Sequence, residues 1–235
     1  NTLNGLLNRV SRRISSKDEF ISNAAHQLRN PVAGVLALAE AVQTAPNAQT
    51  AKKRIAELLD AAREASELTN KLLSFERASG TDIAQSGAKV DLHHLLKNAV
   101  LAFQSQHSEC PLVFDLNVPP DIALIKADET MLQEAILNLF SNSLVHGGPK
   151  VSNVSVRMSV AGQMATIIIS DNGVGIPPDR HLQALSRFSQ AGGGPGSGLG
   201  LAIAARVLKN HQGELDIQDT TGGTSIRLSL PIVQP

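Results

Sequence analysis

The feature that most constrains the fold is a stripe of apolar residues from Leu3 to Leu72, in steps of three and four apart from an interruption at Lys17 and the turn at Pro46. This spacing places the apolar side chains on one face of an α-helix. Pro46 and Asn47 suit a turn and divide the stripe, so we predict two long helices joined as a hairpin. The stripe comprises Leu3, Leu7, Val10, Ile14, Ile21, Ala25, Leu28, Val32, Val35, Ala39 and Val42, then Ala51, Ile55, Leu58, Ala62, Ala65, Thr69 and Leu72.

A hairpin of this kind needs a partner, because most helix stability in water comes from packing against neighbouring elements. Two copies would form a four-helix bundle, so the sequence predicts a homodimer. The stripe shifts its phase and widens around Ala24 and Ala25, as expected where a two-stranded coiled coil opens into a bundle.

The composition limits the classes of function. In 235 residues, 21 Lys and Arg balance 21 Asp and Glu, and Trp and Tyr are absent, so nothing indicates nucleic acid binding.

The single Cys110 cannot form an intramolecular disulfide, and we expect a reduced, partly buried thiol. No apolar run approaches the roughly 20 residues that span a bilayer. Because the chain begins at Asn1 rather than Met, we expect a fragment or processed form of a longer protein. No signal peptide is visible, and we expect this part to be cytoplasmic.

A change of composition after Arg77 marks a domain boundary, because ASGTDIAQSGA (78–88) is rich in small and polar residues. The part before it is all-helical, and the part after it mixes short strands with helices. We predict a coiled-coil helix over 1–18, a helical hairpin over 19–77, a linker over 78–89 and an α/β domain over 90–235.

His26 follows the striped position Ala25, so it lies at the edge of the apolar face, within reach of solvent. Pro31 cannot donate to the carbonyl of Gln27, so we expect the helix to bend there and to let a large partner approach the histidine. The alternative is an ordinary surface histidine on a kinked helix.

The second domain has a strong helix pattern over Glu129–His146, with Asn138 and Asn142 four residues apart and therefore on one face. One interpretation is a plain polar surface. The other is a pair of amide oxygens that reach a hydrated magnesium ion, which prefers oxygen ligands.

Glycine-rich segments follow this helix. NVSVRMSV and MATIIIS predict a hairpin that ends in DNGVGIP, where Asp171 follows an apolar strand and Gly173 and Gly175 allow close approach to a ligand. GGGPGSGLGLAIAARVLK then leads into a helix whose free N–H groups could bind phosphates. It is neither a Rossmann fingerprint, which follows a strand, nor a P-loop.

Taken in order, these segments resemble the boxes of bacterial sensor histidine kinases. FISNAAHQLRNP resembles the H box, LNLFSNS the N box, and LSRFSQ the F box; DNGVGIP, GSGLGLAI and GGTSIRL resemble the three glycine boxes. Six boxes in the right order are specific. The resemblance implies a dimeric dimerisation and histidine-phosphotransfer hairpin after a coiled-coil signalling helix. An α/β-sandwich ATPase domain of the gyrase, chaperone and histidine kinase type would follow, with a mixed, mostly antiparallel sheet.

The resemblance also implies roles for single residues. His26 would attack the γ-phosphate of ATP and pass the phosphoryl group to an aspartate of a response-regulator receiver domain. Asp171, supported by Thr224 through water, would bind the adenine amino group. Mg²⁺ would be held by Asn142 and, second, Asn138, and residues 189–198 would form a lid with Phe188 at its base. The expected nucleotide-binding residues are Asn138, Asn142, Asp171, Gly173, Gly175, Phe188, Gly196, Gly198, Leu199, Gly200 and Thr224.

Two departures from the family pattern bear on activity. Gln27 replaces the usual acid after the histidine and can orient the ring but cannot take its proton. Asn30 could position a water molecule against the phosphohistidine, which suggests phosphatase activity toward the regulator; a polar residue that merely precedes Pro31 is the plain alternative. Val145 stands where the family often has a cation, and Arg187 is the nearest substitute in the sequence.

These departures leave alternatives to an active kinase. One is a weakly catalytic nucleotide-binding scaffold or pseudokinase. Another is a related ATPase or a serine-directed kinase of the same superfamily. An inner-membrane anchor in the full-length protein also stays possible by the resemblance.

Overall fold

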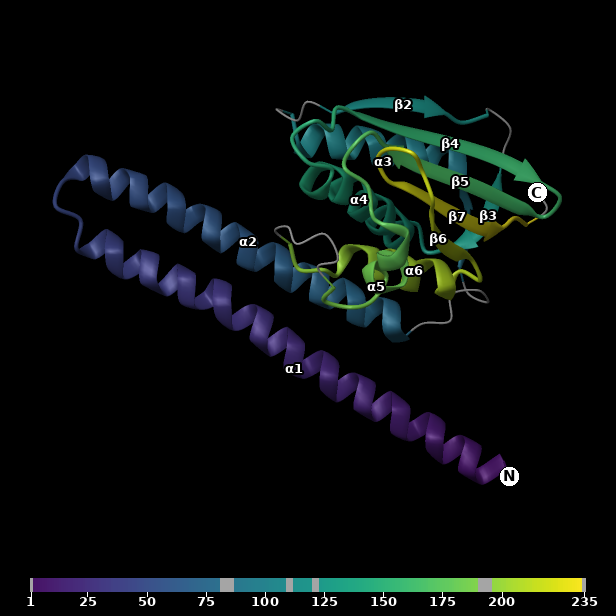
Figure 1. Ribbon diagram of the computed structural model, residues 1–235, viewed down its shortest axis with the longest axis horizontal. Coiled ribbons are helices and arrows are strands. Elements are labelled where there is room, and N and C mark those ends of the chain that lie inside the picture. Colours follow the sequence, from purple (N-terminus) through teal and green to yellow (C-terminus); the bar gives the residue numbers. More distant parts are fainter. Residues whose placement is uncertain (1, 81–86, 109–111, 120–122, 190–195, 234–235) are drawn as a thin grey trace. The chain divides into compact units, whose positions relative to one another are not determined.

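The computed structural model describes residues 2–80, 87–108, 112–119, 123–189 and 196–233, with backbone alone over 2–16 and at residue 80 (Figure 1). Cys110 and most of the expected lid therefore lie outside the described residues. The chain divides into two compact units, Asn1–Leu73 and Ser74–Pro235, and each is described by itself.

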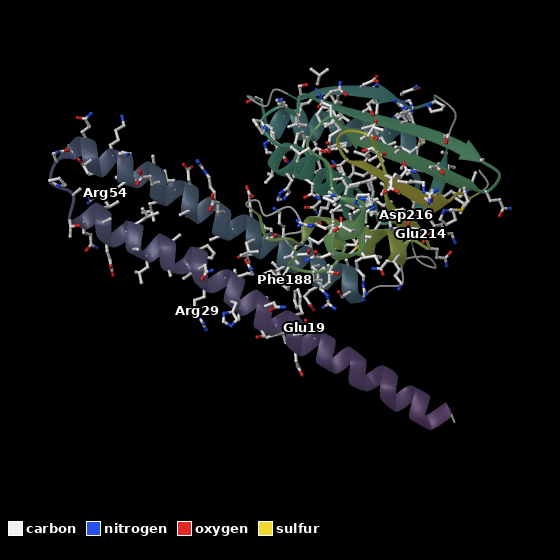
Figure 2. All side chains as sticks on the ribbon, in the orientation of Figure 1. Glu19, Arg29, Arg54, Phe188, Glu214 and Asp216 are labelled. Carbon is white, nitrogen blue, oxygen red and sulfur yellow. The ribbon has the colours of Figure 1, made fainter. Side chains whose placement is uncertain are left out.

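The first unit is the predicted helical hairpin of α1 (Thr2–Gln43) and the greater part of α2 (Ala48–Gly80). Pro31 lies inside α1, which continues beyond it for three further turns, so the proline does not end the helix. Asn47 caps α2 by accepting from the Thr50 amide at 2.8 Å, and the Arg54 guanidinium donates to the Ala41 carbonyl beside the turn (Figure 2).

The hairpin covers only part of its apolar surface. On α2, Ala51, Leu58 and Ala65 are half-buried at steps of seven, whereas Ile55 and Leu59 are 45% and 51% exposed. On α1, Val32 and Leu36 are 59% and 62% exposed. The stripe seen in the sequence is therefore wider than one hairpin can bury.

The second unit contains a five-stranded sheet in the order β2-β4-β5-β7-β6 and a two-stranded sheet of β1 and β3. β2 pairs with β4 in parallel, and the other neighbours are antiparallel, which confirms the expected mixed sheet. The strands are β1 (Ala88–Asp91), β2 (Val113–Asn117), β3 (Leu124–Ala127), β4 (Asn153–Ala161), β5 (Met164–Asp171), β6 (Glu214–Gln218) and β7 (Ser225–Pro231). The helices are α3 (Leu92–Gln106), α4 (Glu129–His146), η1 (Pro178–Arg180), α5 (His181–Ala184) and α6 (Gly200–Asn210).

α3, α4 and α6 lie against one face of the five-stranded sheet (Figure 1), so this unit has two layers. The strands bury alternate residues, such as Ile167 and Ile169 on β5 and Leu228 on β7, as a half-buried sheet requires. Phe103 and Phe140 meet edge to face at 5.7 Å between ring centroids, and both are fully buried in the core between the layers.

His211 links the end of α6 to the start of α4. Its ring is 2% exposed; Nδ1 donates to the Val207 carbonyl at 2.7 Å, and Nε2 accepts from the Asp128 amide at 3.0 Å. Asp128 caps α4 by accepting from the Met131 amide. Burial lowers the pKa of His211, because a charged ring would lose its hydration in the core.

The last two turns of α2 belong to the second unit. Ser74 donates to the Glu134 carboxylate on α4 at 2.9 Å, and Phe75 is 6% exposed. Asn210 and Arg206, one turn apart on α6, donate to the carbonyls of Ala78 and Ser79. These donors satisfy carbonyls that the end of a helix leaves without an intrahelical partner.

Candidate nucleotide-binding site

The centre of the candidate site is the carboxylate of Asp171 at the end of β5. Oδ1 accepts from the backbone amides of Gly173 at 2.9 Å and Thr224 at 3.0 Å, and Oδ2 accepts from the Ser143 hydroxyl at 3.0 Å. Thr224 therefore supports Asp171 directly through its backbone. Three donors fix the orientation of the carboxylate and leave acceptor capacity on Oδ2, which suits an amino group of a ligand.

Ser143 is a site residue that the sequence analysis missed. Its side chain is 6% exposed, and it lies directly after Asn142 on α4, so it joins the helix with the asparagine pair to the strand that ends in Asp171. The available signal was weak: a hydroxyl in the middle of a helix competes for backbone hydrogen bonds and often has a specific partner.

The asparagine pair lies on the α4 face toward the start of α6. Asn138 and Asn142 are both half-buried, and a Cβ on Gly200 would lie 2.9 Å from Asn142 Oδ1. Among the described residues, the Asn142 side-chain nitrogen is buried and has no hydrogen-bond partner. The amide therefore lies against the Gly200 backbone, where a side chain would collide with it, and its oxygen is of the ligand type that Mg²⁺ prefers.

Two glycine loops pack closely behind Asp171. A Cβ on Gly173 would lie 2.5 Å from the Gly147 carbonyl oxygen. A Cβ on Gly223 would lie 1.8 Å from the Asp171 carbonyl oxygen, so neither position has space for a side chain. Gly175, with φ of +78°, has its α-carbon against the Gly223 carbonyl. Only glycine fits this approach of the segment after β5 to the segment before β7.

The described end of the expected lid packs against the F-box segment. A Cβ on Gly198 would lie 2.7 Å from the Phe188 carbonyl carbon, and Leu199 is fully buried. Phe188 has φ of +56°, which is unusual for a bulky residue and marks a constrained backbone (Figure 2). Residues 190–195 lie outside the described residues. Of the expected lid, the structure therefore describes residue 189 at one end and residues 196–198, including Gly196, at the other.

The structure also locates the substitute cation that the sequence suggested. The Arg187 guanidinium lies over the Phe75 ring, with 5.4 Å from Cζ to the centroid, so it contacts the end of α2. Val145 is 47% exposed on α4.

The remaining predicted residues belong to the first unit. His26 and Asn30 are exposed on α1, and Gln27 is half-buried. The structure thus brings Asn138, Asn142, Asp171, Thr224 and the glycine segments together in one unit, with the histidine on a helix of the other. An exposed imidazole can meet a large partner, which a buried one cannot.

An acceptor carboxylate at a strand end, an amide-bearing helix and a glycine loop before a helix define a nucleotide-binding domain. Residues 127–234 match the family model described as histidine kinase-, DNA gyrase B-, and HSP90-like ATPase, and residues 16–81 match the His Kinase A (phospho-acceptor) domain. With these two domains in this order, the chain belongs to the sensor histidine kinases of two-component systems, as a catalytic core.

Curated relatives and solved structures agree with this family. The chain is 27% identical over 230 residues to the sensor-like histidine kinase SenX3 of Mycobacterium tuberculosis, covering 94% of this chain and 55% of SenX3. It is 29% identical over 251 residues to the sensor histidine kinase TrcS of the same organism, covering 99% of this chain and 48% of TrcS. The chain thus spans about half the length of these relatives.

Among solved structures, the mycobacterial sensor histidine kinase MprB has a TM-score of 0.56 at 28% identity, over 63% of this chain and 99% of that one. The histidine kinase ThkA, solved in complex with the response regulator protein TrrA, has a TM-score of 0.74 at 17% identity, over 94% of this chain and 64% of that one. The second likeness concerns the fold alone. Over the described residues, no helix is both long and apolar enough to cross a membrane.

Proposed function

We propose that this chain is the catalytic core of an ATP-dependent histidine autokinase that phosphorylates His26 and passes the phosphoryl group to a response regulator. The observation that carries the proposal is the Asp171 carboxylate, held by Ser143, Gly173 and Thr224 beside the asparagine face of α4. A carboxylate fixed in this way accepts from the amino group of adenine and offers no donor to the carbonyl of guanine.

Asn142, with Asn138 as the second ligand, would hold Mg²⁺ by its amide oxygen. The support is the Asn142 side chain, whose oxygen, the atom that would bind the cation, lies against Gly200 and whose buried nitrogen has no hydrogen-bond partner among the described residues. Bound Mg²⁺ neutralises charge on the phosphates. The amides at the start of α6 are donors for the same phosphate oxygens, because the first turn of a helix leaves its N–H groups without intrahelical partners.

His26 would act as the nucleophile. A neutral imidazole nitrogen forms the new N–P bond, the bond from the γ-phosphorus to the bridging oxygen breaks, and ADP leaves with that electron pair. The ring N–H proton is then lost to solvent, since Gln27 orients the ring but cannot act as a base. Transfer to a regulator aspartate forms a P–O bond, breaks the N–P bond and regenerates His26. Because ATP and regulators are cytoplasmic, this core would act there.

We further infer a homodimer through the hairpin. The exposed side chains of Val32, Leu36, Ile55 and Leu59 form an apolar surface that a single hairpin leaves in water. A second copy would bury it as a four-helix bundle. Asn30, exposed one turn after His26, would hold a water molecule for hydrolysis of a regulator phosphate.

The test is transfer of label from γ-labelled ATP with magnesium to the wild type, to His26→Ala and to His94→Ala, an exposed-histidine control. We expect label on the wild type and on His94→Ala only, and the label should be acid-labile and alkali-stable. Label that survives on His26→Ala would contradict the assigned nucleophile. If nothing is labelled although nucleotide binds, the chain is a nucleotide-binding scaffold.

A further inference from the structure

His181, the first residue of α5, contacts two segments that are far apart in the chain. Its Nε2 donates to the Ile176 carbonyl at 2.9 Å, since a carbonyl oxygen can only accept. Its Nδ1 lies 3.8 Å from Oδ1 of Asp219, which directly follows β6. The His181 side chain is 16% exposed, so the ring is largely enclosed between the two segments.

The first of these segments is the turn after Asp171. Ile176 directly follows Gly175, and a Cβ on Gly175 would lie 2.6 Å from the Gly223 carbonyl oxygen of the other segment. The hydrogen bond from His181 to the Ile176 carbonyl therefore acts one residue away from the close approach of the two glycine loops.

The second segment is the β6–β7 loop, which begins at Asp219. The Thr220 hydroxyl donates to the Gly223 carbonyl at 2.8 Å, so the loop is bridged within itself. The loop ends at Thr224, whose backbone amide donates to Asp171 Oδ1 at 3.0 Å. A contact that holds Asp219 therefore also holds the loop that carries one of the donors orienting the Asp171 carboxylate.

The number of protons on the ring decides the strength of its second contact. Nε2 carries a proton in either state, because it donates to a carbonyl. A neutral ring therefore turns an unprotonated Nδ1 toward the Asp219 carboxylate, and two acceptors form no hydrogen bond. A second proton, on Nδ1, makes the ring a cation 3.8 Å from a carboxylate oxygen. The charged side chains of η1, which packs against α5, are Asp179 and Arg180, and both are exposed.

We propose that His181 is a positioning residue for adenine recognition, which joins the turn after Asp171 to the β6–β7 loop and joins them more tightly when its ring is protonated. The inference rests on the proposed function, because it assumes that Asp171 binds adenine. His181 acts on the base through Asp219 and Thr224, which hold the carboxylate in place. Its contribution to nucleotide affinity should therefore increase as the pH falls through the range in which imidazoles titrate, about pH 8 to 5.

The test measures the affinity of the whole chain for ADP with magnesium, by calorimetry at pH 8 and pH 6. ADP has no γ-phosphate to transfer, so the chain is not phosphorylated during the titration. The proteins are the wild type, His181→Gln, His181→Ala and Asp219→Asn. Each variant is compared with the wild type at the same pH, so that protonation of the ADP phosphates and of other side chains cancels.

His181→Gln keeps a donor for the Ile176 carbonyl but cannot become charged. It should match the wild type at pH 8 and bind ADP about twofold to threefold more weakly at pH 6, as expected for an ion pair with an exposed carboxylate. Asp219→Asn should show the same loss at pH 6 only. His181→Ala removes both contacts and should bind ADP about threefold more weakly at pH 8 as well.

His181→Gln combined with Asp219→Asn should lose no more at pH 6 than either single variant, because each removes the same ion pair. His94→Gln is the matched control, since its ring also lies 3.9 Å from an aspartate, Asp91, and it should follow the wild type at both pH values. A His181→Gln variant that follows the wild type at pH 6, or that loses equally at both pH values, would overturn the proposal. A wild type that binds no nucleotide would instead refute the proposed function, so the two failures are distinguishable.

Discussion

The Ser143 hydroxyl donates to Asp171 Oδ2 at 3.0 Å, and this contact joins α4, with its asparagine pair, to the strand that ends at the candidate adenine site. Ser143 thus occupies one acceptor position of the carboxylate, while the Gly173 and Thr224 amides occupy Oδ1. The orientation of Asp171 therefore depends on a helix as well as on two loops.

Replacing Ser143 with alanine should weaken adenine recognition, because the carboxylate loses one of three donors and can rotate. We expect ATP to bind about tenfold more weakly, from the loss of a hydrogen bond to a charged group. Selectivity for ATP over GTP should fall as well, and titration with both nucleotides measures this. Ser141→Ala on the same helix is the matched control, and equal losses in both variants would refute the assigned role.

Gly200→Ala separates ligand binding from stability. A Cβ at this position would approach Asn142 Oδ1 to 2.9 Å and displace the amide. Magnesium-dependent ATP affinity should fall at least about fivefold through loss of a ligand oxygen, while alanine in the first turn of α6 should leave thermal stability unchanged or slightly raised. Gly34→Ala, which has open space around it inside α1, should leave ATP affinity unchanged and raise thermal stability slightly.

The buried ring of His211 should make stability depend on pH. Its pKa is lowered in the folded state, so the unfolded chain binds a proton more readily, and the free energy of unfolding rises with pH through this window. The contribution is complete above about pH 6.5 and is lost as the pH falls toward the folded-state pKa. Urea unfolding at several pH values measures this slope. His211→Leu should flatten it, whereas His94→Leu should retain it.

Phe75 should stabilise the second unit although it lies on a helix of the hairpin. It is 6% exposed, and Arg187 lies over its ring. Phe75→Ala should lower the free energy of unfolding by about 3 kcal/mol, the lower end for a buried phenylalanine. The exposed neighbour Glu76→Ala should change it by less than about 0.5 kcal/mol. A small effect of Phe75→Ala would mean that the end of α2 does not fold as part of this unit.

Periodicity predicted the hairpin and α4 because each has a long stripe with one buried side and a recognisable start or turn. The Asp128 cap and the change of pattern at Gly147 place the ends of α4 at the predicted residues. Pro31 was harder to interpret, because a helix interior can accommodate a proline when the lost hydrogen bond is exposed to water. The spacing predicted the helix through Pro31 to Val42, and α1 does run on to Gln43; the bend expected at Pro31 stays a prediction.

The sequence predicted those parts of the candidate site whose residues lie close together in the chain. Asp171 and its glycines are neighbours in sequence, so their proximity follows from one turn. Ser143 and Asp171 are 28 residues apart, and His211 and Asp128 are 83 apart, so their contacts depend on how α4 and α6 pack on the sheet. The contact of Arg187 with Phe75 could not be expected either, since nothing local indicates that α2 ends inside the second unit.

α4 and α6 are joined at one end and frame the candidate site at the other. His211 ties the end of α6 to the cap of α4, whereas Asn142 and Gly200 face one another near the opposite ends. A hydrogen bond at one end restrains that end, so a small change of the angle between the helices would displace Asn142 and Gly200 more than His211. Under the proposed function, a change of nucleotide would therefore alter the spacing of Asn142 and Gly200 while the core around His211 stays packed.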